Sequence, residues 1–202
     1  MDPADGKSEL RRRAQAIRAS LRKCRDIASA QVVTHLLPEL RARRPRIVGA
    51  YRALDDEIDP VPLVEVLRQE GMEVALPAVE RRRAPLVFRR YRPGDRLRRS
   101  AFGIEEPVSG APALRPEVLL VPLLAFDRDG HRLGFGAGYY DRTIAALRAA
   151  GDLFAVGLAY AAQEVPALPR EPHDMALDLI ATEEGLIRPH GPAPSTVPGG
   201  TT

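Results

Sequence analysis

Residues 119–142 read LLVPLLAFDRDGHRLGFGAGYYDR and place three structural signals in direct succession. An apolar run at 118–121 predicts a buried strand that ends at Pro122. Three glycines then occupy alternate positions: Gly134, Gly136 and Gly138. Helical spacing follows over 140–150. Because a strand, a glycine loop and a helix start present backbone N–H groups at the positive end of a helix dipole, this segment predicts a loop that binds a phosphate-bearing ligand.

The glycine spacing by itself fits an ordinary turn equally well. It is neither the G-x-G-x-x-G of dinucleotide-binding proteins nor the G-x-x-x-x-G-K-[ST] of P-loop enzymes, so neither mechanism transfers directly. Two flanking charges favour the ligand over the plain turn. Arg132 can pair with a phosphate, and Asp141 can hold Mg²⁺ beside it.

The composition is that of an ordinary globular protein, with 202 residues, 45% hydrophobic and 28% charged. We expect one domain over residues 1–188 and a disordered tail at 189–202, which is rich in Pro, Gly, Ser and Thr. No segment approaches the ~20 apolar residues of a membrane span, and the polar start shows no signal peptide. Cys24 is the only cysteine, which excludes an intrachain disulfide and a cysteine metal cluster. These features favour a cytoplasmic protein without a membrane partner.

The formal charge of +3 raises the question of a nucleic-acid partner. A modest basic face is expected on the first helix, from Arg11, Arg12, Arg13, Arg18, Arg22 and Arg25. Aromatic residues make up only 5% and show no stacking pattern. A solvated face, or one that attracts a polyanionic small molecule, is therefore favoured over a nucleic-acid surface.

Apolar spacing predicts strands alternating with helices, and thus a mainly parallel α/β sheet. The predicted helices cover residues 7–23, the surroundings of 32–40 and of 63–67, and 140–150. The predicted strands cover 46–51, 72–76 (closed by Pro77), 86–91, 118–121, 154–158 and 177–181. Residues 92–116 are expected to be mostly loop. Ligands of such sheets bind beyond the carboxyl ends of the strands, where the loops at 52–57 and 123–138 are expected to meet.

The chain resembles the 5-formyltetrahydrofolate cyclo-ligase family, also called methenyltetrahydrofolate synthetases. The resemblance runs in order from Lys7 to about Thr182. Its matching residues are Lys7, Leu10, Arg11, Tyr51, Asp56, Glu57, Leu76, Pro77, Phe102, Gly103, Ile104, Glu106, Pro107, Val121, Pro122, Phe126, Asp127, Gly130, Arg132, Leu133, Gly134, Gly136, Gly138, Tyr139, Tyr140, Asp141, His173 and Asp174. The resemblance implies a three-layer α/β/α fold with a mainly parallel sheet, like that of CoA-transferases and sugar-phosphate isomerases.

The resemblance implies an ATP- and Mg²⁺-dependent ring closure. 5-Formyltetrahydrofolate, possibly polyglutamated, would become 5,10-methenyltetrahydrofolate with release of ADP and phosphate. A formamide carbonyl is a poor electrophile, and phosphorylation of its oxygen gives an iminium-like phosphate that the neighbouring N10 amine can attack. The protein's part would be alignment and charge stabilisation rather than covalent catalysis.

The resemblance also implies residue roles on the nucleotide side. The catalytic residues would be Lys7, Arg132 and Tyr139. The ATP contacts would be Lys7, Ser8, Glu9, Leu10, Arg11, Arg132, Leu133, Gly134, Phe135, Gly136, Ala137, Gly138, Tyr139 and Tyr140. Lys7 and Arg11 lie about one helical turn apart and can share a face, although an exposed basic helix end would look the same in sequence.

The implied folate contacts are Arg52, Glu57, Phe135, Gly136, Ala137, Gly138 and Tyr139. A buried carboxylate at Glu57 would suit the pterin's amino and ring N–H groups, and the plain alternative is a solvated loop acid. The implied metal ligands are Asp141 and Asp174, whose alternatives are a helix N-terminal acid and a loop cap. His131 and His173 are expected to be structural.

Two positions depart from the family pattern. Leu123 stands where glycine is common, and Ala137 stands where glycine or lysine is usual. They leave room for a diverged, non-catalytic folate- or nucleotide-binding paralogue. The retained charges at the implied site favour the enzyme over this rival and over a nucleic-acid-binding module. We expect a monomer that acts on a small molecule.

Overall fold

The computed structural model describes residues 3–100 and 103–189. Its main feature is a seven-stranded sheet in the order β11-β10-β9-β6-β1-β2-β3. The strands are β1 (Ile47–Gly49), β2 (Glu73–Ala78), β3 (Val87–Arg90), β6 (Val118–Pro122), β9 (Phe154–Leu158), β10 (Leu179–Thr182) and β11 (Gly185–Ile187). The five central strands are parallel, and β3 and β11 are antiparallel at the two edges. The predicted mainly parallel sheet is confirmed.

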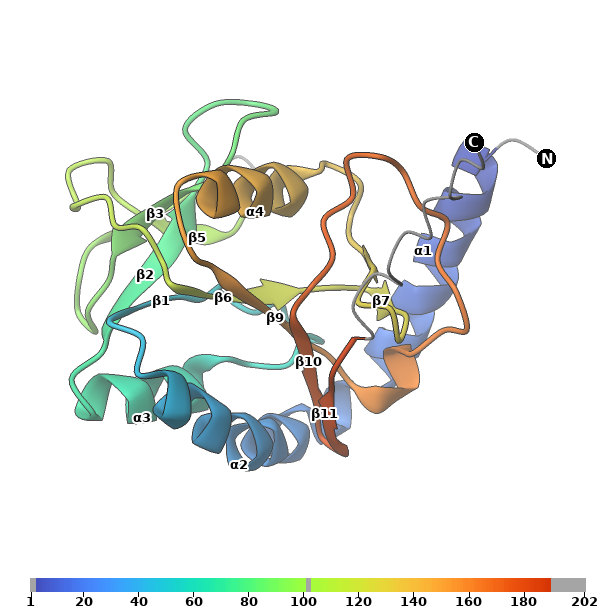
Figure 1. Cartoon of the computed structure of the whole chain (residues 1–202), viewed down its shortest axis with the longest axis horizontal. Coiled ribbons are helices and arrows are strands. Elements are labelled where there is room, and N and C mark those ends of the chain that lie inside the picture. Colours follow the sequence, from blue (N-terminus) through green and yellow to red (C-terminus); the bar gives the residue numbers. More distant parts are fainter. Residues whose placement is uncertain (1–2, 101–102, 190–202) are drawn as a thin grey trace, which may run out of the picture.

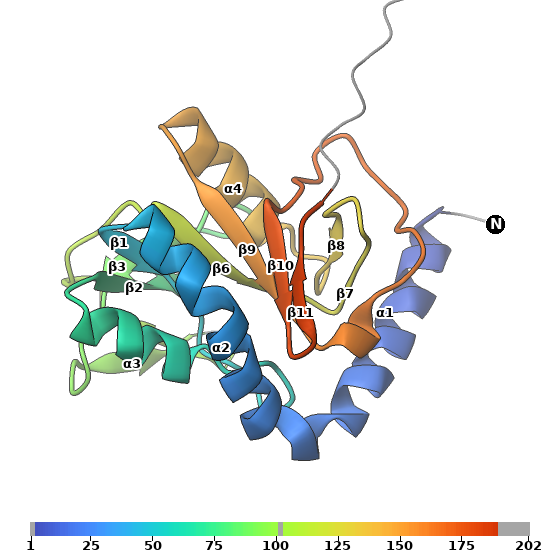
Figure 2. The same ribbon diagram turned by 60° about the horizontal axis from the view of Figure 1, so that its bottom comes forward.

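Helices cover both faces of this sheet, which confirms the three layers. The helices are α1 (Pro3–Ser20), α2 (Arg25–Arg43), α3 (Val61–Gln69) and α4 (Tyr139–Ala149), with short 3-10 turns η1 (Arg22–Cys24) and η2 (Ala161–Gln163). Helices α2 and α3 lie on one face and α4 lies on the other (Figure 1). Helix α1 stands apart from both layers, beside the end of the sheet (Figure 2). No helix in the described part of the chain has the length and apolar character of a membrane span.

Strand β6 shows how the sequence builds two cores from one run of apolar residues. Successive side chains of a strand point to opposite faces. Accordingly Val118 and Leu120 pack with α2 and α3, whereas Leu119 and Val121 pack on the α4 side. A continuous apolar strand of this kind is typical of a parallel sheet buried on both faces.

After β6 the chain forms a small hairpin that positions the glycine loop. Its strands are β7 (Ala125–Phe126) and β8 (Arg132–Leu133). The buried Asp127 carboxylate accepts the backbone N–H groups of Asp129 and His131, and Gly130 takes φ = 86° in the turn. Ala14 of α1 packs against Leu133 and its neighbours. The hairpin therefore ties α1 to the loop that follows β8.

The structure differs from the sequence-based expectations at several boundaries. The strands expected to stop at Pro77 and Pro122 include those prolines. Pro77 lies beyond Ala75, the last residue of β2 that pairs with β1, so it pairs with β3 only. The loop-rich stretch at 92–116 contains a two-stranded sheet, β4 (Leu97–Arg99) and β5 (Glu105–Pro107). These short strands pair with each other, a contact that apolar spacing does not indicate.

Several predictions fall at the limits of the described residues. Phe102 of the resemblance lies outside them, as does the expected tail apart from Pro189. Pro189 packs on the turn at Gly130, where an added Cβ would lie 2.8 Å from its Cγ. Leu123 is buried, and its Cδ2 lies 2.8 Å from the position of a Cβ on Gly157, so the larger residue at 123 packs over a glycine of β9.

Candidate active site

Three loops meet at the carboxyl ends of the parallel strands, as the topology predicts. They are residues 50–57 after β1, 123–138 after β6, and 159–175 after β9. Helix α1 closes the side of this region, since it contacts η2 and packs on the β7–β8 hairpin. The candidate site is built from these four segments.

The glycine loop, residues 134–138, connects β8 to α4. Gly136 and Gly138 have φ values of 94° and 65°, a left-handed backbone that residues with a Cβ adopt only under strain. Gly138 is the residue immediately before α4. A Cβ on Gly134 would meet nothing within 4 Å, so this part of the loop is open to a ligand. The loop thus has the geometry for an anion at a helix N-terminus.

Helix α1 directs two cations toward this region. Lys7 Nζ lies 3.1 Å from Glu171 Oε1 and 3.3 Å from Asp174 Oδ2, and its side chain is only 12% exposed. Arg11 Nε donates to the carbonyl oxygen of Gly134 at 3.0 Å. The two residues share a face, as their spacing predicts, and that face is turned toward the site rather than toward solvent.

Arg132 and Asp141 form an ion pair at 2.6 Å between Nη2 and Oδ1. The Arg132 side chain is 4% exposed, and this burial lowers the pKa of its guanidinium while the Asp141 charge opposes that shift. The backbone N–H of Met175 donates to the same Asp141 oxygen at 3.1 Å, and Arg132 donates to the Met175 carbonyl. Because Asp174 precedes Met175, this segment brings both implied metal ligands to one place.

The two carboxylates are suited to a cation. Asp141 accepts both of its hydrogen bonds through Oδ1, and Asp174 accepts from Lys7 and from the Glu171 N–H through Oδ2. Among the described residues, neither of the second oxygens accepts a hydrogen bond. Glu171, His173 and Asp174 also bring one ligand atom each within 4.8 Å of one another. The carboxylate oxygens in this set are the hard donors that Mg²⁺ prefers, whereas the His173 ring offers a nitrogen.

Glu57, in the loop after β1, is buried and ion-paired. Its Oε1 accepts from Arg18 Nη1 at 2.9 Å, and its Oε2 accepts from the Leu54 N–H at 2.9 Å. The side chain is only 4% exposed, and burial raises the pKa of its carboxyl. The alternative of a solvated loop acid is therefore wrong.

Phe135 of the glycine loop lies near the ion pair of Glu57 and Arg18. The guanidinium carbon of Arg18 lies 5.3 Å from the centre of the Phe135 ring, which is 53% exposed. Burial raises the pKa of Tyr140, and the Glu57 charge adds to that rise. The Phe135 ring lies near Arg18, the ion-pair partner of Glu57, so the loop after β1 approaches the glycine loop at this residue.

Comparison with known proteins identifies the family of the chain. The family model described as "5-formyltetrahydrofolate cyclo-ligase family" matches residues 3–183. The chain belongs to this family. A 5-formyltetrahydrofolate cyclo-ligase of Haemophilus influenzae is 33% identical over 177 residues, which is 85% of this chain and 94% of that protein. One of Mycolicibacterium smegmatis is 35% identical over 151 residues, 70% of this chain and 76% of that protein.

Solved structures of cyclo-ligase relatives share the fold. The 5,10-methenyltetrahydrofolate synthetase of Aquifex aeolicus superposes with a TM-score of 0.74 at 34% identity, over 90% of this chain and 92% of that one. The synthetase of Mycoplasma pneumoniae gives a TM-score of 0.70 at 23% identity, over 91% of this chain and all of that one. The second match supports the fold alone.

For several residues implied by the cyclo-ligase resemblance, the structure shows exposure to solvent or contacts with other parts of the chain. Ser8 is exposed, Glu9 pairs with Arg12 and Arg13, and Leu10 packs on the core beneath the β7–β8 hairpin. Arg52 pairs with Glu105 at 2.8 Å. Tyr139 opens α4, and its carbonyl accepts from Thr143 Oγ1. Contacts of these residues with ATP or folate remain predictions.

Arg18 is a residue of this site that the sequence analysis placed only on a basic face. It is 3% exposed and pairs with both Glu57 and Asp56, at 2.9 and 3.0 Å. The signal was present, since Lys7, Arg11 and Arg18 are four and seven residues apart and fall on one helix face. The partners of Arg18 were not visible in the sequence, because they come from the loop after β1.

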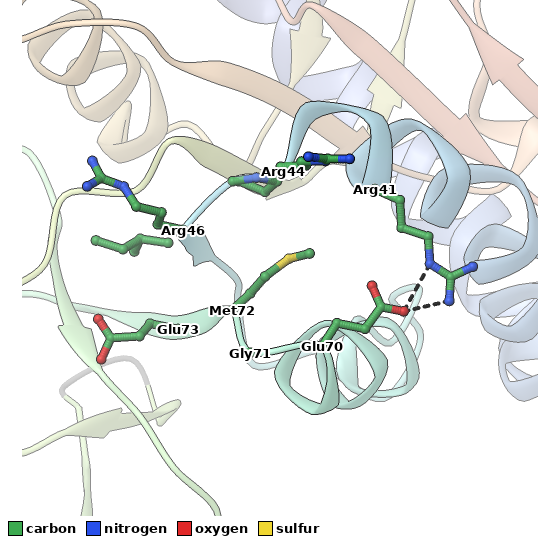
Figure 3. Close-up of a pocket in the computed structure, with 9 residues that line it drawn as sticks. Arg41, Arg44, Arg46, Glu70, Gly71, Met72 and Glu73 are labelled. Carbon is green, nitrogen blue, oxygen red and sulfur yellow. Dashed lines mark hydrogen bonds and ion pairs between the residues drawn. The ribbon is translucent and has the colours of Figure 1, made fainter.

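The hollow in Figure 3 lies at the opposite end of the sheet. It has a volume of about 680 Å³ at the amino ends of β1 and β2, between Arg44, Arg46 and Glu73, with an ion pair of Arg41 and Glu70 on its rim. No residue of the glycine loop lines it. Ligands of parallel α/β sheets bind at the carboxyl ends of the strands, and this hollow lies at the amino ends. The candidate site is therefore assigned to the glycine loop and the charged side chains around it.

Proposed function

We propose that the chain catalyses the ATP- and Mg²⁺-dependent cyclisation of 5-formyltetrahydrofolate to 5,10-methenyltetrahydrofolate, with release of ADP and phosphate. The observation that carries the proposal is that α1 places Arg11 on the glycine loop and Lys7 on Asp174, while the ion pair of Arg132 and Asp141 flanks the same loop at the N-terminus of α4. Two cations from α1 and an ion pair from the segment that carries the loop thus lie together, which suits a highly charged ligand.

The nucleotide's phosphates would lie along the glycine loop. Backbone N–H groups of residues 134–138 and the α4 dipole would stabilise their charge, and Arg11 would pair with them from α1. The Lys7 ammonium would leave Glu171 and Asp174 and pair with the terminal phosphate during its transfer. Asp141 and Asp174 would hold the magnesium through their second oxygens.

Glu57 would bind the folate ring. A carboxylate that is fixed by Arg18 and the Leu54 N–H still has acceptor sites for the amino and ring N–H groups of a pterin. Phe135, exposed on the glycine loop beside Arg18, would cover the ring's face. This arrangement would align the formyl oxygen with the nucleotide's terminal phosphate.

The bound nucleotide supplies the phosphoryl group that turns the formyl oxygen into a leaving group. The residues of the chain would align the reactants and stabilise the charge of the transferred group. Arg132, held rigidly by Asp141 and the Met175 carbonyl, keeps a fixed positive charge beside the loop. Preorganised charge of this kind stabilises phosphoryl transfer without reorganisation at the moment of reaction.

A direct assay tests the proposed activity. Purified protein is incubated with 5-formyltetrahydrofolate, and the near-ultraviolet absorbance of the methenyl product is followed with ATP and Mg²⁺, with ATP alone and with Mg²⁺ alone. We expect product only when both are present, with one ADP released per turnover. Product formation without ATP would contradict the proposal, and folate binding without turnover would instead identify a non-catalytic paralogue.

The raised pKa of Glu57 predicts an unusual pH dependence of folate binding. The carboxylate should be lost at a higher pH than the ordinary glutamate pKa of about 4.3, so the KM for folate should rise as the pH falls toward that raised pKa. Glu57→Gln should raise the KM roughly 10- to 100-fold at neutral pH, since one charge-assisted hydrogen bond is lost. It should also flatten the acid limb of the KM profile.

The matched control for Glu57 is Glu65→Gln, which removes an exposed carboxylate from α3. This variant should keep both the KM and its pH profile. A Glu57→Gln enzyme whose KM still rose in acid as in the unchanged protein would show that another group governs folate binding.

A further inference from the structure

Arg142 folds back from the first turn of α4 onto the glycine loop. Its Nη2 donates to the carbonyl oxygen of Ala137 at 2.6 Å. Its Nη1 lies only 2.8 Å from the position of a Cβ on Gly138, so a side chain at 138 would displace the guanidinium. Arg142 therefore lies against the last two residues of the loop, and Arg11 lies against Gly134 and Gly136 at the other end.

The amino end of α4 is an unfavourable position for this charge. Cations are stabilised at helix C-termini, whereas Arg142 lies at the amino end of α4 beside the positive pole of the dipole. Over residues 6–100 and 103–189, no carboxylate lies within ion-pair distance of its guanidinium. Its Nε is buried and has no hydrogen-bond partner in the same part of the chain. The Tyr139 ring, 5.4 Å away, is a weak substitute for an anion.

The other cations of the site differ in their partners. Lys7 and Arg132 are each paired with acids, so much of their charge is already compensated. Arg11 and Arg142 instead donate to loop carbonyls, at Gly134 and Ala137. The loop is thus contacted by two guanidinium groups that donate to its carbonyl oxygens and not to acids.

We propose that Arg142 is a phosphate-binding residue of the nucleotide site and acts opposite Arg11. This inference rests on the proposed function. On binding, Arg142 would exchange the Ala137 carbonyl for phosphate oxygens, which its planar guanidinium can contact through two N–H groups. Ala137 has no charged side chain, so Arg142 supplies the positive charge at this end of the loop. The repulsion between Arg142 and the α4 dipole would be relieved only when the anion is present.

Calorimetric titration of the full-length protein in the presence of Mg²⁺ tests this role. Dissociation constants are measured for ATP, ADP, AMP and inorganic phosphate. Arg142→Gln should weaken ATP and ADP binding roughly 10- to 100-fold, because one charge-assisted contact is lost, and should change AMP binding less than about threefold. Arg142→Lys should restore only part of the loss, since an ammonium cannot make the planar double contact.

The matched control is Arg148→Gln in the last turn of the same helix. Arg148 pairs with Asp178 at 2.9 Å, and this variant should leave all four dissociation constants unchanged. Equal ATP affinity of Arg142→Gln and the unchanged protein would overturn the inference and leave the proposed function standing. An equal loss for AMP and ATP would also overturn it, since that pattern indicates a distorted loop. If the unchanged protein did not bind ATP, the proposed function itself would fail.

Discussion

Lys7→Ala is expected to lower kcat roughly 100- to 1,000-fold while the protein stays folded. The ammonium is paired with Asp174 and Glu171, and in the proposed reaction it exchanges these acids for the terminal phosphate. Loss of one preorganised charge of this type has an effect of about that size on kcat. Steady-state kinetics with saturating ATP and folate give the measurement.

The chain provides a matched control for Lys7, because it has only one other lysine. Lys23 is exposed in η1, away from the glycine loop, and Lys23→Ala should keep full activity. Lys7→Arg separates charge from shape: if a compact ammonium is required, arginine should restore little of the rate. A Lys7→Ala enzyme with an unchanged kcat would show that Lys7 is only a structural partner of Asp174.

Asp141→Asn is expected to affect both activity and stability. The substitution removes an implied magnesium ligand and leaves Arg132, 4% exposed, without its countercharge. Breaking a buried ion pair from one side costs about 3 kcal/mol of unfolding free energy, which corresponds to a fall in the melting temperature of roughly 6–12 °C for a chain of this size. The turnover should fall by roughly 1,000-fold, with a higher Mg²⁺ concentration needed for half-maximal rate.

Thermal melts and magnesium titrations at a temperature where the variant is folded distinguish these two effects. Asp129→Asn serves as the control, because Asp129 pairs with Arg170 on the surface. Such exposed pairs contribute about 0–1 kcal/mol, so this variant should melt and turn over like the unchanged protein. If folded Asp141→Asn had an unchanged magnesium requirement, Asp141 would be a partner of Arg132 alone.

Local patterns were sufficient for much of the architecture. The strand at 154–158 has the predicted bounds, and the helix expected over 140–150 is α4, shifted by one residue. Periodicity failed where pairing partners define the element. The β7–β8 hairpin and the β4–β5 pair are two or three residues per strand, too short for an alternation pattern, and exist because each strand meets another.

The candidate site was predictable to the extent that its residues are neighbours in sequence. The glycine loop, Arg132 and Asp141 lie within ten residues, and Lys7 and Arg11 share a helix face. The role of Arg18 could not be predicted from the sequence, because its partners Asp56 and Glu57 lie in another loop. Arg142 was also missed, since sequence shows that it follows Asp141 but not that it folds back onto Ala137.

The amino-acid sequence by itself determined the α/β class, the loop with its obligatory glycines and the family, because these depend on residue types and their spacing within one element. Only the tertiary structure decided which charges face one another. Lys7 and Asp174 are 167 positions apart, and Met175 supplies the N–H that fixes Asp141. These contacts arise because parallel strands return every connecting loop to the same edge of the sheet, where residues distant in sequence become neighbours.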